Sequence, residues 1–454
     1  MKKGLFIFRR DYRIVDNSAL IKLSQICDTI YPIFIFTPEQ VGRNLYKSDR
    51  SVQFMIESLK ELNQITGNHL STFYGTNIKV LEDLFSQNKI DIVAFNCDYT
   101  PYSIQRDISI IKLCEKHNIQ ITFEHDYNLN HPDQILNSSH ETYQKFTPYY
   151  ESALKHGVAS VKKQSSFTFS NSISSQKQFN ITLDEAMMRF TTYDPEVELK
   201  GGRTRAIAQL KVAKKQQHDY SNTHNTLSFK TSQLSAYIKF GCISIREVYF
   251  VMKHNTSFVR QLYWRDFYSN ILYSFPHVLG KSLKPKYDAI RWSQNKKFLD
   301  AWKKGETGFP IVDAGMRQLN QTGYMHNRAR LIVASFLVKT LLQDWREGER
   351  YFASRLIDYD VASNNGNWQW IMGGGADSQP YFRIFNPWLQ SIEHDKEAIY
   401  IKTWVKELMN IPVKDIHRWY ETGKKYSDIH YALPIVDFSS QKDKILALYH
   451  SHVN

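Results

Sequence analysis

The sequence predicts two domains of different fold class, an α/β domain followed by an all-helical domain. In roughly the first 127 residues, short apolar runs alternate with stretches whose apolar residues recur at helical spacing. From about residue 186 onward helical patterns dominate, and the Ser-rich, nearly uncharged segment 165–175 lies between the two regions. We therefore expect an α/β domain over residues 1–127, an interdomain linker over 128–185 and a helical domain over 186–454.

The α/β domain is predicted from five apolar runs and the amphipathic segments between them. In the segment 51–65, Phe54, Leu59, Leu62 and Ile65 recur at helical spacing. Strands and helices in alternation imply a doubly wound parallel sheet with right-handed crossovers. The expected strands cover residues 4–8, 29–36, 71–75, 91–96 and 120–125, and a second helix covers 104–117.

The second domain is predicted to be helical because its apolar residues recur three or four positions apart. We find no internal repeat, and no heptad run that is long enough for a coiled coil. The expected helices cover residues 206–217, 232–239, 245–253, 298–304, 311–319, 328–342 and 350–356.

The composition favours an intracellular protein with a polyanionic partner. The formal charge is +13, which suits nucleic acid, although a solvated basic surface needs no partner. Four cysteines without a CxxC spacing argue against a disulfide framework and against a zinc site, so we expect no metal. No signal-peptide core is present, and no apolar stretch approaches the roughly 20 residues that cross a bilayer. The expected compartment is the cytoplasm or the nucleus.

Charged and amide side chains gather in the segment 357–370, IDYDVASNNGNWQW. Asp358 and Asp360 are two residues apart and do not share a helical face, so they should have different partners. Arg330 precedes a strongly apolar helical stretch, where a half-buried guanidinium needs a carboxylate, and Asp358 is the natural candidate. The alternative is structural, because Asn-Gly is ordinarily a turn signal and an Asp before it can cap a helix.

Hydroxyl groups precede another predicted helix, in the stretch KTSQLS at residues 230–235. Taken alone they could cap the helix, or they could hold an anion together with the free backbone amides. Arg265 could supply the neutralising charge. Seven of the nine tryptophans lie between Trp264 and Trp388, although a single Trp is most often a core residue.

Eight ordered segments of the sequence together carry a family resemblance. The segments are FRRDYRIVDN (8–17), TSQLS (231–235), WRDFY (264–268), TGFPIVDAGMR (307–317), MHNRAR (325–330), DWREGE (344–349), the stretch 358–370 and PYFRIFNP (380–387). With these segments the chain resembles the photolyase and cryptochrome family of flavoproteins over nearly its whole length. Within that family it is most similar to class I cyclobutane pyrimidine dimer photolyases, the light-driven DNA repair enzymes.

The resemblance implies FAD in the helical domain and a light-harvesting antenna in the α/β domain. It implies an amide at flavin N5, here Asn364, which tunes the redox and protonation state of the cofactor. The residues that it places around the phosphates and the ribityl chain are Tyr220, Thr231, Ser232, Leu234, Ser235 and Arg265. Those that it places around the isoalloxazine are Asn327, Arg330, Asp358, Asp360 and Asn364.

The resemblance also implies an electron chain and a DNA site. Trp302, Trp345 and Trp368 would carry an electron from the surface to photoexcited flavin, in that order. Photolyases flip their target base out of the duplex, so UV-damaged DNA is the expected partner, bound by a monomer. The residues implied at the lesion or on the DNA backbone are Gln261, Trp264, Asn327, Arg328, Trp370 and Arg383.

Two positions depart from the class I pattern. Gln261 stands where a Glu is usual, as in six-four photolyases and animal cryptochromes, whereas Asn327 and Leu331 stand where the six-four group has histidines. Thr100 stands where folate-binding members have a Glu, so the antenna is open among deazaflavin, folate and none.

Repair of cyclobutane dimers, by electron transfer from photoexcited reduced FAD to a flipped-out lesion, is the leading hypothesis. The alternatives are a six-four photolyase, a cryptochrome-like blue-light receptor and a basic DNA-binding flavoprotein without chemistry. Such a receptor would usually carry a C-terminal extension, and the chain ends at Asn454, about where the helical domain should end.

Overall fold

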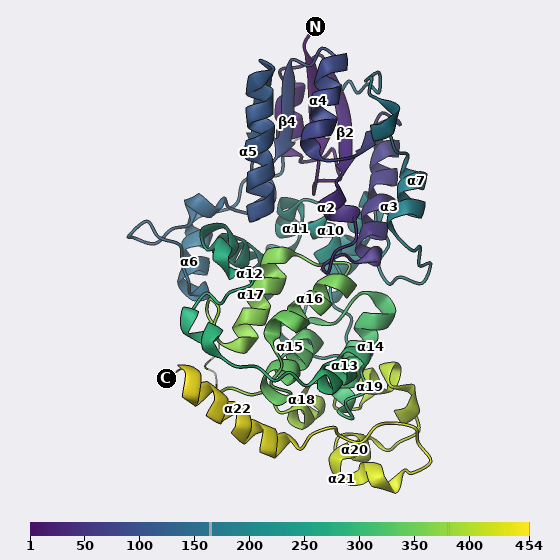
Figure 1. Ribbon diagram of the computed structural model, residues 1–454, viewed down its shortest axis with the longest axis vertical. Helices are drawn as coiled ribbons and strands as arrows, with labels where there is room; N and C mark the ends of the chain where they lie inside the picture. The colour runs from purple at the N-terminus through teal and green to yellow at the C-terminus, as the bar shows by residue number, and fades with distance from the viewer. Residues whose placement is uncertain (163–165, 379, 381, 454) are drawn as a thin grey trace.

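The N-terminal domain is built on a five-stranded parallel sheet with the strand order β3-β2-β1-β4-β5. The computed structural model describes residues 1–162, 166–378, 380 and 382–453, and Figure 1 shows the sheet at one end of the elongated molecule. Each strand agrees with its predicted range to within one residue at either end, which confirms the predicted fold class. The strands are β1 (Lys3–Phe8), β2 (Thr29–Phe36), β3 (Ser71–Tyr74), β4 (Ile92–Asn96) and β5 (Gln120–Glu124).

Helices cover both faces of this sheet, because alternate residues of the buried strands face opposite sides. These helices are α1 (Ser18–Ser24), α2 (Pro38–Val41), α3 (Asp49–Ile65), α4 (Asn77–Gln87) and α5 (Pro101–Lys116). Leu5 and Ile7 of β1 pack with α4 and α5, whereas Phe6 and Phe8 pack with α1 and α3.

The C-terminal domain is helical, as predicted, and it forms the lower body of the molecule in Figure 1. Its helices are α8 (Arg203–Gln216), α9 (Tyr220–Thr223), α10 (Ser235–Lys239), α11 (Ile245–Met252), α12 (Thr256–Ser274), α13 (Lys296–Lys304), α14 (Pro310–Thr322), α15 (Asn327–Ser335), α16 (Trp345–Arg355), α17 (Val361–Met372), α18 (Pro387–His394), α19 (Ile399–Trp404), α20 (Val413–Ile416), α21 (Trp419–Thr422) and α22 (Phe438–Val453), with a π-helical turn η5 at Phe336–Thr340. The preceding helix α7 (Leu183–Phe190) lies beside α3 in Figure 1, and its Phe190 packs against Phe36 of β2 and Tyr74 of β3.

The Asn-Gly pair at 365–366 lies inside helix α17, so the turn interpretation of these residues is wrong. Asp360 is the N-cap of this helix, and its side chain accepts a hydrogen bond from the Ser363 amide. A Cβ atom on Gly366 would lie 2.1 Å from Cδ1 of Tyr268 on α12. The glycine is therefore needed for the close approach of α12 and α17, and this packing outweighs its low helix propensity.

The segment 128–185 contains a helix, α6 (Phe146–His156), and the 3₁₀ turns η1 (Pro132–Gln134) and η2 (Lys177–Phe179). Helix α6 packs against α12, and Phe169 from the Ser-rich stretch forms a bridge with Ile30 of β2. Residue 165 of that stretch, with 163 and 164 before it, lies outside the described residues. The segment is thus packed against both domains, and its boundaries as a linker stay a prediction.

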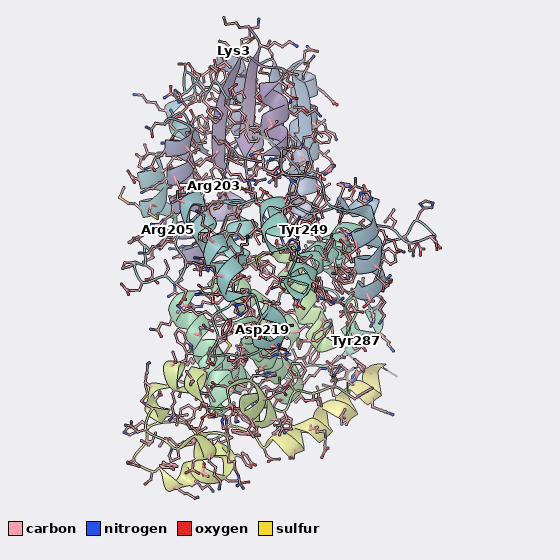
Figure 2. All side chains as sticks on the ribbon, turned by 180° about the vertical axis from the view of Figure 1, so that it is seen from behind. Lys3, Arg203, Arg205, Asp219, Tyr249 and Tyr287 are labelled. Carbon is pink, nitrogen blue, oxygen red and sulfur yellow. The ribbon has the colours of Figure 1, made fainter. Side chains whose placement is uncertain are left out.

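A buried ion network joins the two domains. Arg246 on α11 donates to Asp16 (2.9 Å) and to Asp126 (2.6 Å), and Arg13 forms a second ion pair with Asp126. Burial alone would raise the pKa of Asp126, but the guanidinium groups of Arg13 and Arg246 hold it well below its ordinary value. A less buried pair lies at the same junction, where Arg203 on α8, which is labelled in Figure 2, donates to Glu247 (2.7 Å).

Candidate functional site

A cavity of about 390 Å³ lies in the helical domain, between α9, α10 and α12 on one side and the first turns of α15 and α17 on the other. A smaller cavity of about 90 Å³ shares several of its lining residues and extends along α17. The predicted residues that line the larger cavity are Tyr220, Ser232, Leu234, Ser235, Gln261, Trp264, Arg265, Asn327, Arg330, Asp358, Asp360 and Trp370. Asn364 and Trp368 line the smaller one.

Asp358 forms the ion pair that the sequence predicted. Its Oδ2 accepts hydrogen bonds from Arg330 Nη2 (2.9 Å) and from Ser235 Oγ (2.6 Å). Arg330 also donates Nε to the Met325 carbonyl, which fixes the guanidinium plane. The Oδ1 atom of Asp358 is buried and has no hydrogen-bond partner among the described residues. One carboxylate oxygen is therefore left to accept a hydrogen bond from a ligand.

Asp360 meets residues of the α/β domain, so the two aspartates have different partners, as predicted. Its Oδ2 accepts from Tyr127 Oη (2.6 Å) and from Arg10 Nη2 (2.7 Å). Burial alone would raise the pKa of Asp360, but Arg10, Arg265 and the Tyr127 hydroxyl hold it well below its ordinary value. Sequence reasoning missed Tyr127 and Arg10. The available signal was the Arg9-Arg10 pair at the carboxyl end of β1, the edge of a parallel sheet where binding sites form.

Arg265 offers an unpaired guanidinium nitrogen at the same cavity. Its Nη1 donates to the Tyr127 carbonyl (2.9 Å), and its Cζ lies 3.7 Å from the centre of the Tyr127 ring. Its Nη2 is buried without a hydrogen-bond partner among the described residues. With the hydroxyl-bearing Ser232 and Ser235 on the same wall, this donor set suits phosphate. Thr231 is not among the residues that line the cavity, and its hydroxyl is hydrogen-bonded to Tyr324.

The amide of Asn364 has a fixed orientation. Its Nδ2 donates to the backbone carbonyl of Glu349 (3.1 Å), so its oxygen is the atom left to face the smaller cavity. Together, the unpaired Asp358 oxygen, the Arg265 nitrogen and this amide fit a cofactor that carries both ring N–H donors and phosphates. FAD is such a group.

The rim of the larger cavity carries the residues predicted at the lesion. Trp264 and Trp370 are half-buried and Gln261 is exposed, and all three line the cavity. The Gln261 amide donates only a long hydrogen bond, to the Ser257 carbonyl (3.4 Å), so it is held weakly.

The tryptophans predicted as an electron chain are all buried, which does not suit the predicted place of Trp302 at the surface end. Trp302 and Trp345 are 0 % exposed and Trp368 is 2 % exposed. The Trp302 ring lies 6.2 Å from the Trp368 ring, and its Nε1 donates to the Val333 carbonyl. Trp302 is enclosed by the core and lies against Trp368, so its place in the chain stays a prediction.

Trp292 is a tryptophan that sequence reasoning missed. It is half-buried, and its neighbour Ser293 pairs with Gln343, two residues before Trp345. The Ser293 amide donates to the Leu342 carbonyl (2.8 Å), which fixes this pairing. Trp292 lies in a loop without periodicity, so pattern analysis had no signal for it.

The two arginines predicted on the DNA backbone lie outside the cavity lining. Arg328 is half-buried and donates to Asn225 Oδ1 through Nη2 (2.7 Å) and Nε (3.1 Å). Arg383 is exposed, and its carbonyl accepts from the buried Lys339 ammonium (2.9 Å). Their DNA contacts stay predictions.

A third cavity, of about 380 Å³, lies at the carboxyl ends of β1 and β2. Lys239 and Asp360 line both this cavity and the larger cavity of the helical domain, so the two share a wall. Burial, helped by the charge of Arg10, lowers the pKa of Lys239 to about 7. Thr100 lines this cavity as well, and its hydroxyl caps α5 by accepting from the Ser103 amide (3.2 Å).

An α/β domain joined to a helical domain with this donor set defines a two-domain FAD-binding flavoprotein. The family model described as the FAD binding domain of DNA photolyase matches residues 258–451, and the model described as DNA photolyase matches residues 5–165. A deoxyribodipyrimidine photo-lyase of Buchnera aphidicola subsp. Baizongia pistaciae is 35 % identical over 99 % of this chain and 98 % of its own length. The chain belongs to the DNA photolyase family.

Solved structures agree with this assignment over the whole fold. The archaeal photolyase of Sulfolobus tokodaii, with two FAD molecules, is 39 % identical, with a TM-score of 0.88 over 99 % of this chain and 100 % of that one. A class III photolyase of Agrobacterium tumefaciens is 30 % identical, with a TM-score of 0.89 over 99 % and 98 %. Family membership is thus plain, whereas the class I assignment made from the sequence stays a prediction.

Over the part of the chain that the structure describes, no helix is both long and apolar enough to span a membrane. The same residues include no group of three or more His, Cys, Asp or Glu arranged to hold a metal ion.

Proposed function

We propose that this protein repairs cyclobutane pyrimidine dimers in DNA, in a light-driven reaction that uses reduced FAD. One observation carries the proposal: the Asp358–Arg330 pair and the two rim tryptophans line the same cavity, so a cofactor and a stacked base have adjoining places. The full-length relatives named deoxyribodipyrimidine photo-lyase support this choice of substrate.

The residues present divide into those that would hold the cofactor and those that would hold the lesion. Arg265, Ser232 and Ser235 would bind the phosphates, and Asp358 Oδ1 would accept a ring N–H. When bound, reduced FAD supplies an electron to the lesion on absorbing light and recovers it once the cyclobutane ring has split.

The lesion would leave the duplex at modest cost, because damaged bases already pair poorly. Trp264 and Trp370 would stack against it, and the Gln261 amide would bond to its edge. Arg328 and Arg383 would neutralise neighbouring phosphates, a contribution that weakens with salt.

The test is repair of a defined oligonucleotide that contains one thymine dimer. Purified protein with reduced FAD should restore intact thymines under blue light and should not do so in the dark. Protein that is fully loaded with reduced FAD and restores no thymines under light would refute the proposal.

Gln261 is the observation that favours a six-four photolyase instead. The same assay with a six-four photoproduct decides between the two functions. We expect repair of the dimer alone, because Asn327 lies at this cavity where the six-four group has a histidine. We propose the class I assignment on the same ground.

We also propose that Trp292, Trp345 and Trp368 form the route by which oxidised flavin is reduced. Half-buried Trp292 suits the surface end better than enclosed Trp302 does, and its loop pairs with the segment that leads into Trp345.

An antenna chromophore would bind in the cavity at the carboxyl ends of β1 and β2. Buried guanidinium nitrogens of Arg9 and Arg106, which have no partner among the described residues, favour an anionic or phosphate-bearing chromophore. An absorption spectrum of the purified protein would show its band beside those of FAD.

A further inference from the structure

One face of the Trp264 ring is already occupied by another aromatic ring. Phe146 lies 3.7 Å away between ring centres, at an interplanar angle of 5°. Tyr268 contacts Trp264 as well, at 5.6 Å and 33°. Because Trp264 lines the cavity, these contacts leave a restricted part of its surface for a ligand.

Phe146 is itself held firmly at the start of α6. It is 1 % exposed, and it packs against Tyr150 (5.6 Å, 14°) and edge-on against Phe267 (5.7 Å, 84°). The guanidinium of Arg260 lies over both Phe146 (4.8 Å) and Tyr150 (5.0 Å). The ring that supports Trp264 therefore has little freedom to move.

The chain around α6 is fastened to the helical domain. The fully buried carboxylate of Asp266 accepts the amides of Leu129 (2.7 Å) and Asn130 (3.4 Å) ahead of the helix. The Asp377 amide donates to the Gln144 carbonyl (2.9 Å), which ties the start of α6 to the loop after α17. Helix α6 is thus placed relative to α12 and α17, the helices that carry Trp264 and Trp370.

We propose that Phe146 is a positioning residue for the substrate: it fixes the plane of Trp264 so that the flipped dimer meets a preset platform. This inference rests on the proposed repair function. A tryptophan that is held in one orientation loses little rotamer freedom when a base stacks on it, so the affinity for the lesion is higher than with a mobile ring. Phe146 acts through Trp264 and need not touch the lesion.

The test compares Phe146→Leu with Phe146→Tyr, which keeps the aromatic ring. Phe146→Leu should weaken binding of a thymine-dimer oligonucleotide by about 3- to 10-fold, given the usual worth of an aromatic pair. FAD content, affinity for undamaged DNA and the repair yield at saturating substrate should not change. Phe146→Tyr should keep the wild-type affinity for the thymine-dimer oligonucleotide. Phe167→Leu is the matched control, since it breaks another aromatic stack in the same segment, with Phe169 (5.4 Å, 21°).

A double-mutant cycle with Trp264→Phe separates positioning from general packing. If Phe146 acts through Trp264, Phe146→Leu adds little loss of dimer affinity in the Trp264→Phe background. An equal added loss there, or equal losses for damaged and undamaged DNA, would overturn the inference. Phe146→Met, whose flexible side chain refills the site, replaces Phe146→Leu in the cycle if the leucine variant loses FAD.

The two proposals fail differently. Wild-type protein that repairs no dimers refutes the proposed function. Wild-type protein that repairs dimers while Phe146→Leu binds them equally well refutes the role of Phe146 alone.

Discussion

Gln261 has more freedom than its neighbours at the cavity. Arg330 and Asp358 hold each other, and Asn364 is fixed by the Glu349 carbonyl, whereas the Gln261 amide is exposed and has one long hydrogen bond. A change of chemistry at position 261 should therefore act on the lesion and leave the cofactor residues in place.

We predict that Gln261→Glu leaves FAD binding intact and raises the yield of dimer repair. A carboxylate accepts hydrogen bonds that are about twice as strong as those of a neutral amide, so it should hold the thymine edge more firmly. The measurement is the number of dimers repaired per photon absorbed by the reduced protein. An unchanged yield would show that this side chain does not contact the lesion.

Single residues could be predicted where their chemistry demanded a partner. Arg330 needed a carboxylate and Asp358 supplies it, so this pair was accessible from the sequence. The Tyr127 and Arg10 contacts with Asp360 were not accessible, because they span more than 200 positions and depend on how the two domains pack.

Among the elements, strands were easier to predict than the two helices that build the site. The buried strands of a parallel sheet are continuous apolar runs between turn signals. Helix α12 is buried on several sides and so has no clear apolar stripe, and α17 contains Asn-Gly, which local preference assigns to a turn. Both segments are helical because they pack against each other, with the Tyr268 ring of α12 lying on Gly366 of α17.

The expected electron route runs from the loop of Trp292 through the start of α16 to α17, and it can be tested. Trp345→Phe and Trp292→Phe should each slow photoreduction of oxidised FAD by at least about tenfold, the effect of about 1.4 kcal/mol on a barrier. Both variants should still repair dimers once their FAD has been chemically reduced, since repair uses the flavin and not the tryptophans. Transient absorption after a blue flash measures the first effect and dimer repair the second.

Trp404→Phe is the control for this series, because Trp404 is half-buried on α19 and lines neither cavity of the helical domain. Loss of repair in reduced Trp345→Phe would contradict the assigned roles. Normal photoreduction in Trp292→Phe, with a loss in Trp302→Phe, would restore the original order.

In the whole molecule, the two domains share a charged wall between their cavities. Arg10 and Tyr127 from the α/β domain reach Asp360, and Lys239 lines both cavities. Several arginines of this basic chain thus serve the interior, in ion pairs that add nothing to the net charge. Composition indicated a polyanionic partner but had no means of showing that several arginines pair with buried aspartates at the domain junction.

The junction should contribute measurably to stability, and Arg246→Met tests it. Removing Arg246 leaves Asp16 and Asp126 short of a buried partner, which should lower the free energy of unfolding by about 3–5 kcal/mol near pH 7. The ion pairs lower the folded pKa of Asp126 relative to its unfolded value, so their stabilisation is present above about pH 4 and is lost as the pH falls through the folded pKa.

Denaturant unfolding of both proteins between pH 7 and pH 2 would therefore show a difference that shrinks on acidification. Arg203→Met is the matched comparison, because its ion pair with Glu247 lies at the same junction but is 14 % exposed on each side. It should lower the free energy of unfolding less. A loss as large in Arg203→Met, or a difference between wild type and Arg246→Met that stays constant down to pH 2, would show that the buried network does not hold the two domains together.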